Sequence, residues 1–329
     1  METLRTFKPP RRAARGAALS HVAVALPETR VANEPIAARL GVDPSWIVSR
    51  TGIEERRAVQ AGDTLADLAA RAGQATLDSA QISAEDVDLI LLATTSSDEL
   101  LPNAAPLVAH ALGATGAGAI DVGAACTGFL SGLSLGAAQI EAGRAETVLL
   151  IGAEVLTRFT DPDDRRTAAL FGDGAGAALL TPAAAPGAIG PVVLGADGAE
   201  PGLLWMSRER AVIEMQGQEV FRHAVVRLVE TTLAACDAAG VALEDIDLFV
   251  YHQANARILK TVGQRLELDP ASVVDCIGLH GNTSAASIPI ALDAATRDNR
   301  LHDGAKVLVA AFGAGFTWGG VVVDWRAQA

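Results

Sequence analysis

The chain repeats one structural unit, and this repeat limits the folds that it can form. Residues 75–89 (ATLDSAQISAEDVDL) match residues 234–248 (AACDAAGVALEDIDL), with Glu85 and Glu244 at a spacing of 244 − 85 = 159 positions. The apolar run 148–151 (VLLI) recurs at the same spacing as 307–310 (VLVA). Because two separate segments share one spacing, we interpret the chain as a duplication rather than a chance likeness.

Each copy contains a small-residue helix, an acidic turn and an apolar strand (89–93 and 248–251), followed by a second helix and strand. Such alternation predicts a mostly parallel sheet that helices cover on both faces. The runs 16–26, 175–180 and 319–323 predict further strands. We therefore expect an α/β protein whose two halves pack back to back in five layers, α/β/α/β/α. Binding sites then fall at the join between the halves.

We place the N-terminal half at 16–181 and the C-terminal half at 182–329. Residues 1–15 carry five basic side chains and lack the apolar core of a secretion signal, so we expect a flexible basic leader. Pro and Gly interrupt residues 182–218, which predicts a loop-rich excursion. The excursion either shapes the entrance to a site or merely connects the halves, and the sequence leaves both readings open.

Charge and cysteine content exclude several classes of protein. The formal charge of −13 disfavours nucleic acid and anionic membranes as partners. No apolar run approaches the ~20 residues of a membrane span. Three cysteines without a Cys-x-x-Cys pair indicate neither a disulfide framework nor a zinc site. We expect a soluble, cytoplasmic protein that holds no metal.

Cys126 is the candidate nucleophile. Small residues lead into it, and the apolar stretch 130–140 after it predicts a buried helix. A thiol in the first turn of a helix feels the positive end of the peptide dipoles, which favours the thiolate. Far downstream, His252 and Asn282 supply the partners of a known nucleophile constellation.

The positions of His252 and Asn282 suggest what they do. His252 ends the predicted strand 248–251, where catalytic groups gather in parallel sheets. Gly281 precedes Asn282 and permits a sharp turn of the backbone. A neutral His and an Asn amide can donate to one carbonyl oxygen and so stabilise an enolate. The glycine run 312–316 offers backbone amides for an oxyanion hole.

Six motifs occur in an order that is similar to one enzyme family. They are WIVSRTGIEERR (46–57), ACTGF (125–129), FGDGAG (171–176), HQAN (252–255), GNTSAAS (281–287) and the segment 312–319. Together they resemble the β-ketoacyl-acyl-carrier-protein synthase III family, condensing enzymes of the thiolase fold. The resemblance runs over nearly the whole chain.

The resemblance implies a reaction and its residues. Cys126 would take an acyl group from a coenzyme A thioester, and His252 with Asn282 would promote decarboxylation of a malonyl thioester on an acyl carrier protein. The backbone amides of Cys126 and Ala314 would hold the oxyanion. Phe312 would lie beside the malonyl carboxylate, where an apolar neighbour favours loss of charge. Acyl-CoA is then a substrate, and no cofactor is expected.

The resemblance also implies binding surfaces. Trp46 and Arg165 would stack on the adenine of coenzyme A, and Arg50 would contact its pyrophosphate. The acidic carrier protein would dock on basic side chains of an acidic enzyme. These docking residues are Arg222, Arg257 and Lys260. A homodimer is implied as well.

Three departures from the family pattern suggest a reshaped substrate pocket. Arg166 follows Arg165 where Gly is common, the excursion before Met215 is shorter, and Leu101 replaces an aromatic residue common at the floor of the acyl pocket. These changes favour a specialised member that supplies an unusual starter group to a polyketide pathway.

Three functions remain in competition. The first is decarboxylative Claisen condensation in fatty acid or polyketide initiation. The second is acyl transfer from Cys126 without condensation. The third is an inactive scaffold subunit. Asn282 favours condensation, because plain acyl transfer has less need of an amide that binds an enolate.

Overall fold

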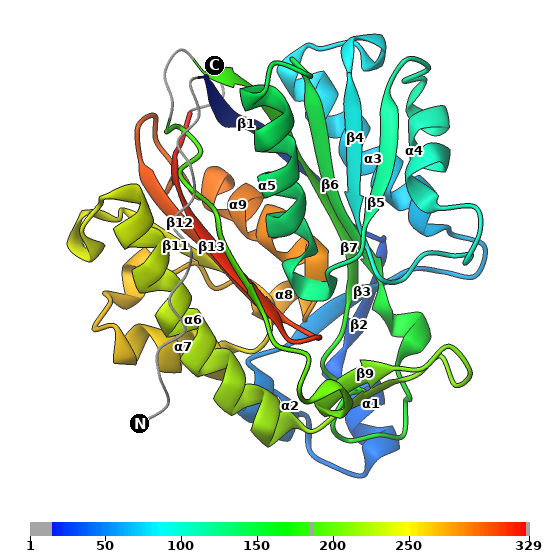
Figure 1. Ribbon diagram of the computed structural model, residues 1–329. Coiled ribbons are helices and arrows are strands. Elements are labelled where there is room, and N and C mark those ends of the chain that lie inside the picture. Colours follow the sequence, from blue (N-terminus) through cyan, green and yellow to red (C-terminus); the bar gives the residue numbers. More distant parts are fainter. Residues whose placement is uncertain (1–14, 184–186, 327–329) are drawn as a thin grey trace.

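The computed structural model describes residues 15–183 and 187–326, which form two main sheets (Figure 1). The first sheet has the order β1 (Gly16–Ala25), β7 (Asp173–Ala183), β6 (Val148–Val155), β4 (Leu89–Ala93) and β5 (Gly118–Val122). The second has the order β8 (Val193–Ala196), β13 (Thr317–Asp324), β12 (Lys306–Gly313) and β11 (Leu248–Tyr251).

Four strands of the first sheet have the same topology as the four strands of the second, which confirms the duplication. In the first sheet Leu89 of β4 pairs with Val148 of β6, and the strands are parallel. In the second, Leu248 of β11 pairs with Val307 of β12 in the same parallel sense. Both pairs keep the spacing found in the sequence. The antiparallel outer strands also correspond, because β7 pairs with β1 as β13 pairs with β8.

Helices form the other three layers, as Figure 1 shows. The outer face of the first sheet carries α3 (Leu65–Ala80) and α4 (Ala104–Leu112), and that of the second carries α6 (Gly217–Ala239) and α7 (Ala256–Arg265). Between the sheets lie α5 (Gly128–Glu141) and α9 (Ser287–Arg297). The five-layer prediction is confirmed, and the helix predicted over 130–140 lies within α5.

Small residues allow the central layer to pack closely. A Cβ added to Gly132 or Gly136 of α5 would lie 2.4 or 2.5 Å from a leucine side chain of the first sheet. A Cβ on Gly152 of β6 would lie 2.3 Å from the carbonyl oxygen of Ala285, which belongs to the other half. The backbones of the two halves therefore meet where no side chain fits between them.

The remaining elements gather near one end of the molecule (Figure 1). They are the antiparallel strand pair β2 (Thr29–Ala32) and β3 (Glu55–Ala58), the helices α1 (Asn33–Leu40), α2 (Pro44–Thr51) and α8 (Ile277–His280), and the hairpin β9 (Leu204–Met206) and β10 (Ile213–Met215). The predicted excursion 182–218 thus contains more than loops, since it includes β8 of the second sheet and the β9–β10 hairpin.

Two further expectations concern the N-terminal leader and the absence of a membrane span. The predicted leader lies outside the described residues except for Arg15, which pairs with Glu146. No helix in the described part of the chain combines the length and hydrophobicity needed to cross a membrane.

We expect Gly152→Ala to lower the free energy of unfolding by about 1–3 kcal/mol, because the new methyl group would overlap the Ala285 carbonyl. Gly116→Ala is the control, since a Cβ there meets nothing within 4 Å. Urea denaturation measures both variants. A Gly152→Ala variant as stable as the control would contradict the close contact.

Candidate active site

Two matching turns begin the central helices. The 3-10 turn η2 (Ala125–Thr127) leads into α5, and η7 (Ser284–Ala286) leads into α9. Ala125 has φ 45° and Ser284 has φ 46°, and the two residues are again 284 − 125 = 159 positions apart. Left-handed backbone at residues other than Gly is costly and is concentrated at functional sites. The two turns pack against each other, so the duplication brings two strained backbones to one place.

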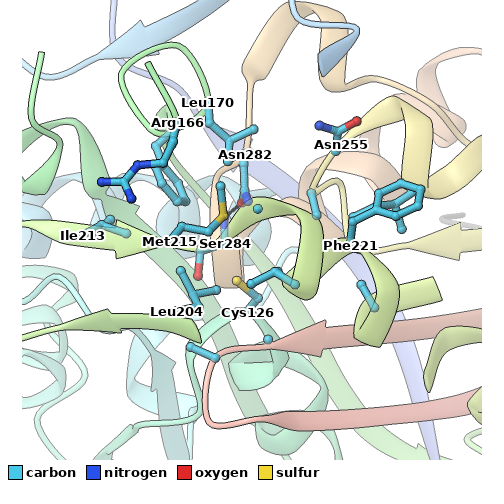
Figure 2. A pocket seen from close by; sticks show the side chains of 18 of the residues that line it. Cys126, Arg166, Leu170, Leu204, Ile213, Met215, Phe221, Asn255, Asn282 and Ser284 are labelled. Carbon is cyan, nitrogen blue, oxygen red and sulfur yellow. Dashed lines mark hydrogen bonds between the residues drawn. The ribbon is translucent and has the colours of Figure 1, made fainter. Parts of the chain in front are cut away.

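A cavity of about 990 Å³ opens at this junction. Cys126 from the first half lines it together with His252 and Asn282 from the second, and Phe312, Gly313 and Ala314 form the adjoining wall. Figure 2 shows Cys126, Ser284 and Asn282 around the same space. The structure therefore brings together the three residues that the sequence proposed as catalytic.

Cys126 is held as a neutral thiol. Its side chain is buried, and a Cβ on Gly313 would lie only 2.9 Å from its backbone nitrogen. Burial raises the pKa of Cys126 to about 12, the nearby charge of Glu154 raises it too, and a hydrogen bond with Ser284 lowers it. Desolvation is the largest of these effects, and it opposes the thiolate that the start of the helix was expected to favour.

His252 is a neutral imidazole whose orientation is fixed. Its Nδ1 lies 2.6 Å from the Ser287 hydroxyl, which also accepts a hydrogen bond from the backbone N–H of Gln253 at 3.3 Å. This contact lets Ser287 donate to Nδ1, and we assign that tautomer, in which the imidazole proton is on Nε2. Burial lowers the pKa of His252 to about 3. The ring thus offers an N–H donor rather than a positive charge.

Asn282 is also held in one orientation. Its backbone N–H donates to Leu170 at 2.9 Å, and its carbonyl accepts from Gly172 at 3.1 Å. Its side-chain Oδ1 accepts from the backbone N–H of Ser284 at 2.9 Å. Because Oδ1 is occupied on the protein side, the Nδ2 amide is the group free to donate into the cavity.

The FGDGAG motif (171–176) supports the site rather than binding a ligand. The Asp173 carboxylate accepts from the hydroxyl and backbone N–H of Thr157 and from the backbone N–H of Val59. A Cβ on Gly172 would lie 2.2 Å from the His280 carbonyl, so only glycine lets this strand end lie beside the turn that carries Asn282.

The sequence analysis did not identify one buried residue of the site, Glu154. Glu154 lies on β6, is fully buried, and accepts hydrogen bonds from Thr94, Thr95, Ser96 and Ser284. Burial raises the pKa of its carboxyl group. The sequence did contain a signal for Glu154, because it is the acidic residue in an otherwise apolar strand (VLLIGAEV). Burying an acidic group is costly, so such a residue is a candidate for a functional role.

The proposed coenzyme A residues line the same cavity. The Arg50 guanidinium lies 4.4 Å from the centre of the Trp46 ring and occupies one face of the indole. Arg165 donates two hydrogen bonds, at 3.0 and 2.7 Å, to the carbonyl of Leu40. Arg166 also lines the cavity and pairs with Asp164 at 2.9 Å (Figure 2).

The proposed docking residues lie beside this opening, whereas Leu101 does not. Arg222 and Arg257 line the cavity, and Lys260 is exposed on α7. Leu101 is 82% exposed on the loop between β4 and α4 and lines no part of the cavity. A single chain therefore does not bring Leu101 to the cavity, and its predicted place at the pocket floor stays a prediction.

Apolar side chains form one wall of the cavity. They include residues of the β9–β10 hairpin, so the segment 182–218 shapes the site and is more than a connector. The wall comprises Leu156, Leu170, Phe171, Leu204, Met206, Ile213 and Met215. Within residues 15–183 and 187–326, no group of His, Cys, Asp or Glu side chains could hold a metal ion.

Family models match both parts of the chain. Residues 120–198 match the model described as 3-oxoacyl-[acyl-carrier-protein (ACP)] synthase III. Residues 236–325 match the model of the C-terminal part of the same synthase. Each match contains catalytic candidates, with Cys126 in the first and His252 and Asn282 in the second.

Individual proteins agree with these models. β-Ketoacyl-[acyl-carrier-protein] synthase III 2 of Streptomyces coelicolor is 46% identical over 94% of each chain. The 3-oxoacyl-(acyl carrier protein) synthase III structure from Pseudomonas aeruginosa PAO1 is 40% identical, with a TM-score of 0.90 over 95% of this chain and 99% of the other.

The priming β-ketosynthase of the R1128 polyketide biosynthetic pathway is 34% identical, with a TM-score of 0.92 over 99% of this chain and 100% of the other. Identity at this level over nearly whole chains, together with the two family models, shows the family to which the chain belongs. The chain belongs to the 3-oxoacyl-[acyl-carrier-protein] synthase III family.

Proposed function

We propose that this protein condenses an acyl-CoA starter with malonyl-acyl carrier protein, releasing carbon dioxide and forming a 3-oxoacyl-carrier thioester. The observation that carries the proposal is the convergence of a thiol, a neutral imidazole and a free amide on one cavity. The first group accepts the acyl chain, and the other two bind the charge that develops on the malonyl thioester.

In the first half-reaction the Cys126 sulfur attacks the acyl-CoA carbonyl carbon and the carbon–sulfur bond to coenzyme A breaks. The proton of the Cys126 thiol ends on the leaving sulfur, so coenzyme A departs as a thiol. The backbone amides of Cys126 and Ala314 are our candidates for the oxyanion hole. Gly313 supports this assignment, because its lack of a side chain lets the turn between β12 and β13 approach the Cys126 backbone.

In the second half-reaction the malonyl carboxylate leaves as carbon dioxide, and its electron pair passes into an enolate. His252 Nε2–H and Asn282 Nδ2–H donate to the enolate oxygen and lower its energy. The enolate carbon then attacks the acyl carbon on Cys126, and the cysteine sulfur departs. Phe312 keeps the carboxylate site apolar, which favours loss of charge. These steps need no cofactor.

Binding of the two carriers is also part of the proposal. We place the adenine of coenzyme A between Trp46 and Arg165, which requires Arg50 to leave the indole face and move to the pyrophosphate. The carrier protein would meet Arg222, Arg257 and Lys260 beside the opening. Local positive charge is needed there because the chain has a net charge of −13.

We further propose a homodimer formed along β5. This strand is the edge of the first sheet, and its Ile120 is 52% exposed. Leu107 on α4 and Leu101 on the preceding loop are exposed on the same half. An open, apolar sheet edge invites pairing, and a two-fold axis would pair β5 with its own copy.

We expect Ile120→Lys to shift the protein towards monomer in analytical ultracentrifugation, because the charge would be buried in that interface. Val226→Lys on α6 is the control, since Val226 is 41% exposed on the other half. A dimer that resists Ile120→Lys would place the interface elsewhere.

The main test follows both half-reactions. The protein is incubated with a panel of acyl-CoAs, the added mass on Cys126 is measured, and malonyl-acyl carrier protein is then supplied. We expect acyl-Cys126, carbon dioxide and a ketoacyl product. Acylation without carbon dioxide would support plain acyl transfer, and no acylation by any donor would support a scaffold.

We expect Asn282→Asp to slow decarboxylation about 10²–10³-fold, because the variant replaces an amide donor with a carboxylate. Acylation of Cys126 should stay within about threefold of wild type, since that step does not use the amide. Asn299→Asp on the surface is the control. Equal losses in both half-reactions would contradict the enolate role.

The neutral state of His252 predicts a pH dependence of stability. The folded pKa is about 3 against an ordinary 6.5, so below pH 6.5 the unfolded chain binds a proton that the native state does not. The free energy of unfolding therefore falls as the pH is lowered below 6.5. This group contributes a loss of about 1.4 kcal/mol for each pH unit. His252→Gln should show the smaller loss between pH 6 and 5 in urea denaturation. Identical slopes would contradict a buried neutral ring.

A further inference from the structure

Two threonine hydroxyls join the halves of the chain beside the nucleophile. The Oγ1 atoms of Thr127 and Thr317 lie 2.8 Å apart, which is a hydrogen-bonding distance. Thr127 is 1% exposed and directly follows Cys126, and Thr317 begins β13 in the other half. A hydroxyl that loses water on burial needs a partner, and the position of this pair shows what else the bond does.

The bond between the two hydroxyls does not depend on which of them donates. Thr127 Oγ1 lies 2.7 Å from the Ala124 carbonyl oxygen, and Thr317 Oγ1 lies 3.3 Å from the Ala314 carbonyl oxygen. If Thr317 donates to Thr127, the Thr127 proton goes to Ala124. If Thr127 donates to Thr317, the Thr317 proton goes to Ala314. Because a carbonyl oxygen only accepts, both arrangements satisfy the hydroxyls and keep the bond between the halves.

The pair connects the two turns that carry the proposed oxyanion hole. Thr127 ends η2, which contains Cys126, and Thr317 directly follows the turn between β12 and β13, which contains Ala314. The backbones of the two turns are in contact, because a Cβ on Gly313 would lie 2.9 Å from the Cys126 nitrogen. Among the described residues, the bond between the threonines is the one hydrogen bond that joins these turns.

The far side of the β12–β13 turn is held within the second half. The backbone N–H and carbonyl of Phe316 pair with the carbonyl and N–H of Asp197, at 2.5 and 2.8 Å. The Phe316 ring also packs on the Phe312 ring, with 4.8 Å between their centres. These contacts fix the turn to its own half, whereas the threonine pair fixes it to the turn that carries the nucleophile.

We propose that Thr127 and Thr317 form a hydroxyl clamp that sets the spacing of the two oxyanion-hole amides. Such a hole requires both N–H groups to lie about 2.7–3.1 Å from the position of one oxygen. The amides of Cys126 and Ala314 come from different halves, so a bond between the halves keeps them in register. Neither threonine lines the cavity, and both are therefore positioning residues that act through the backbone. The clamp rests on the proposed function.

The clamp bears on acylation and not on decarboxylation. In acylation the acyl carbonyl oxygen gains negative charge as the Cys126 sulfur attacks, and it loses that charge as coenzyme A departs. The clamp donates no proton to this exchange and is unchanged at its end. Decarboxylation places its charge on the malonyl thioester oxygen, which in the proposed function contacts His252 and Asn282. Loss of the clamp therefore slows the first process and spares the second.

Thr317→Val removes the clamp and nearly keeps the shape of the side chain. Thr127 retains the Ala124 carbonyl as its acceptor in this variant. Thr317→Ser is the conservative variant, because it keeps the hydroxyl. Thr76→Val is the matched control, since the Thr76 hydroxyl is buried, donates to Ala72 at 2.9 Å and lies outside the cavity. Circular dichroism checks that each variant folds.

The two half-reactions are measured separately. Acylation by acyl-CoA is followed by mass spectrometry, and decarboxylation of malonyl-acyl carrier protein is followed in a Cys126→Ala background. Removing an oxyanion donor costs about 10²–10³-fold, and a displaced donor costs less, so we expect Thr317→Val to slow acylation about tenfold. Decarboxylation should stay within about threefold of its parent. Thr317→Ser and Thr76→Val should acylate within about threefold of wild type.

A double variant tests whether the two hydroxyls act as one unit. We expect Thr127→Val alone to slow acylation about tenfold as well. If both changes break the same bond, the variant that carries Thr127→Val and Thr317→Val should be at most about threefold slower than the slower single variant. Independent effects would multiply to about 10²-fold, which would contradict a shared clamp.

Infrared spectroscopy of the acyl-enzyme reports on the oxyanion hole itself. Acyl-Cys126 is prepared from acyl-CoA labelled with carbon-13 at its carbonyl, and the carbonyl band is measured by difference spectroscopy. Hydrogen bonds from two N–H donors weaken the C=O bond and lower its wavenumber. We therefore expect the band to move to higher wavenumber in Thr317→Val and to keep its place in Thr76→Val. A change in stability alone would not move it.

Each other outcome overturns the clamp. Acylation at the wild-type rate in Thr317→Val, or an unmoved carbonyl band, would show that the bond does not position the amides. Equal losses in both half-reactions, or an equal loss in Thr76→Val, would show a structural role. A wild type that no acyl-CoA acylates would overturn the proposed function and the clamp with it, and this result is read before any variant is made.

Discussion

The close contact between η2 and η7 is the constraint on which the rest of the structure depends. Two strained turns, one from each copy of the repeat, meet with Gly152 and Gly313 beside them. The glycines permit backbone approach that any side chain would block. Because the turns begin α5 and α9, the contact also sets how the central layer packs. The catalytic groups meet there because the two halves meet there.

Burial at this contact decides the protonation states. Burial keeps the Cys126 thiol and the His252 ring neutral and raises the pKa of the Glu154 carboxyl group. Charge then appears only when a substrate reacts, and hydrogen bonds that are already in place can stabilise it there.

The repeat and the apolar runs in the sequence predicted much of the fold. The spacing of the repeat predicted the paired sheets, and the apolar runs predicted the strands, because burial on both faces demands near-continuous apolar sequence. The structure of the excursion 182–218 was harder to predict, because its strands β8, β9 and β10 are short. β8 forms only by pairing with β13, and β9 only by pairing with β10.

The sequence by itself determined the duplication, the five layers and the identities of Cys126, His252 and Asn282, because these depend on periodicity and on motifs of side chains with distinctive chemistry. Only the tertiary structure decided the burial of those groups, the rotation of Asn282, the hydrogen bond between His252 and Ser287 and the contact of Glu154 with Ser284. These properties depend on which atoms surround a group, and residues distant in the sequence supply those atoms.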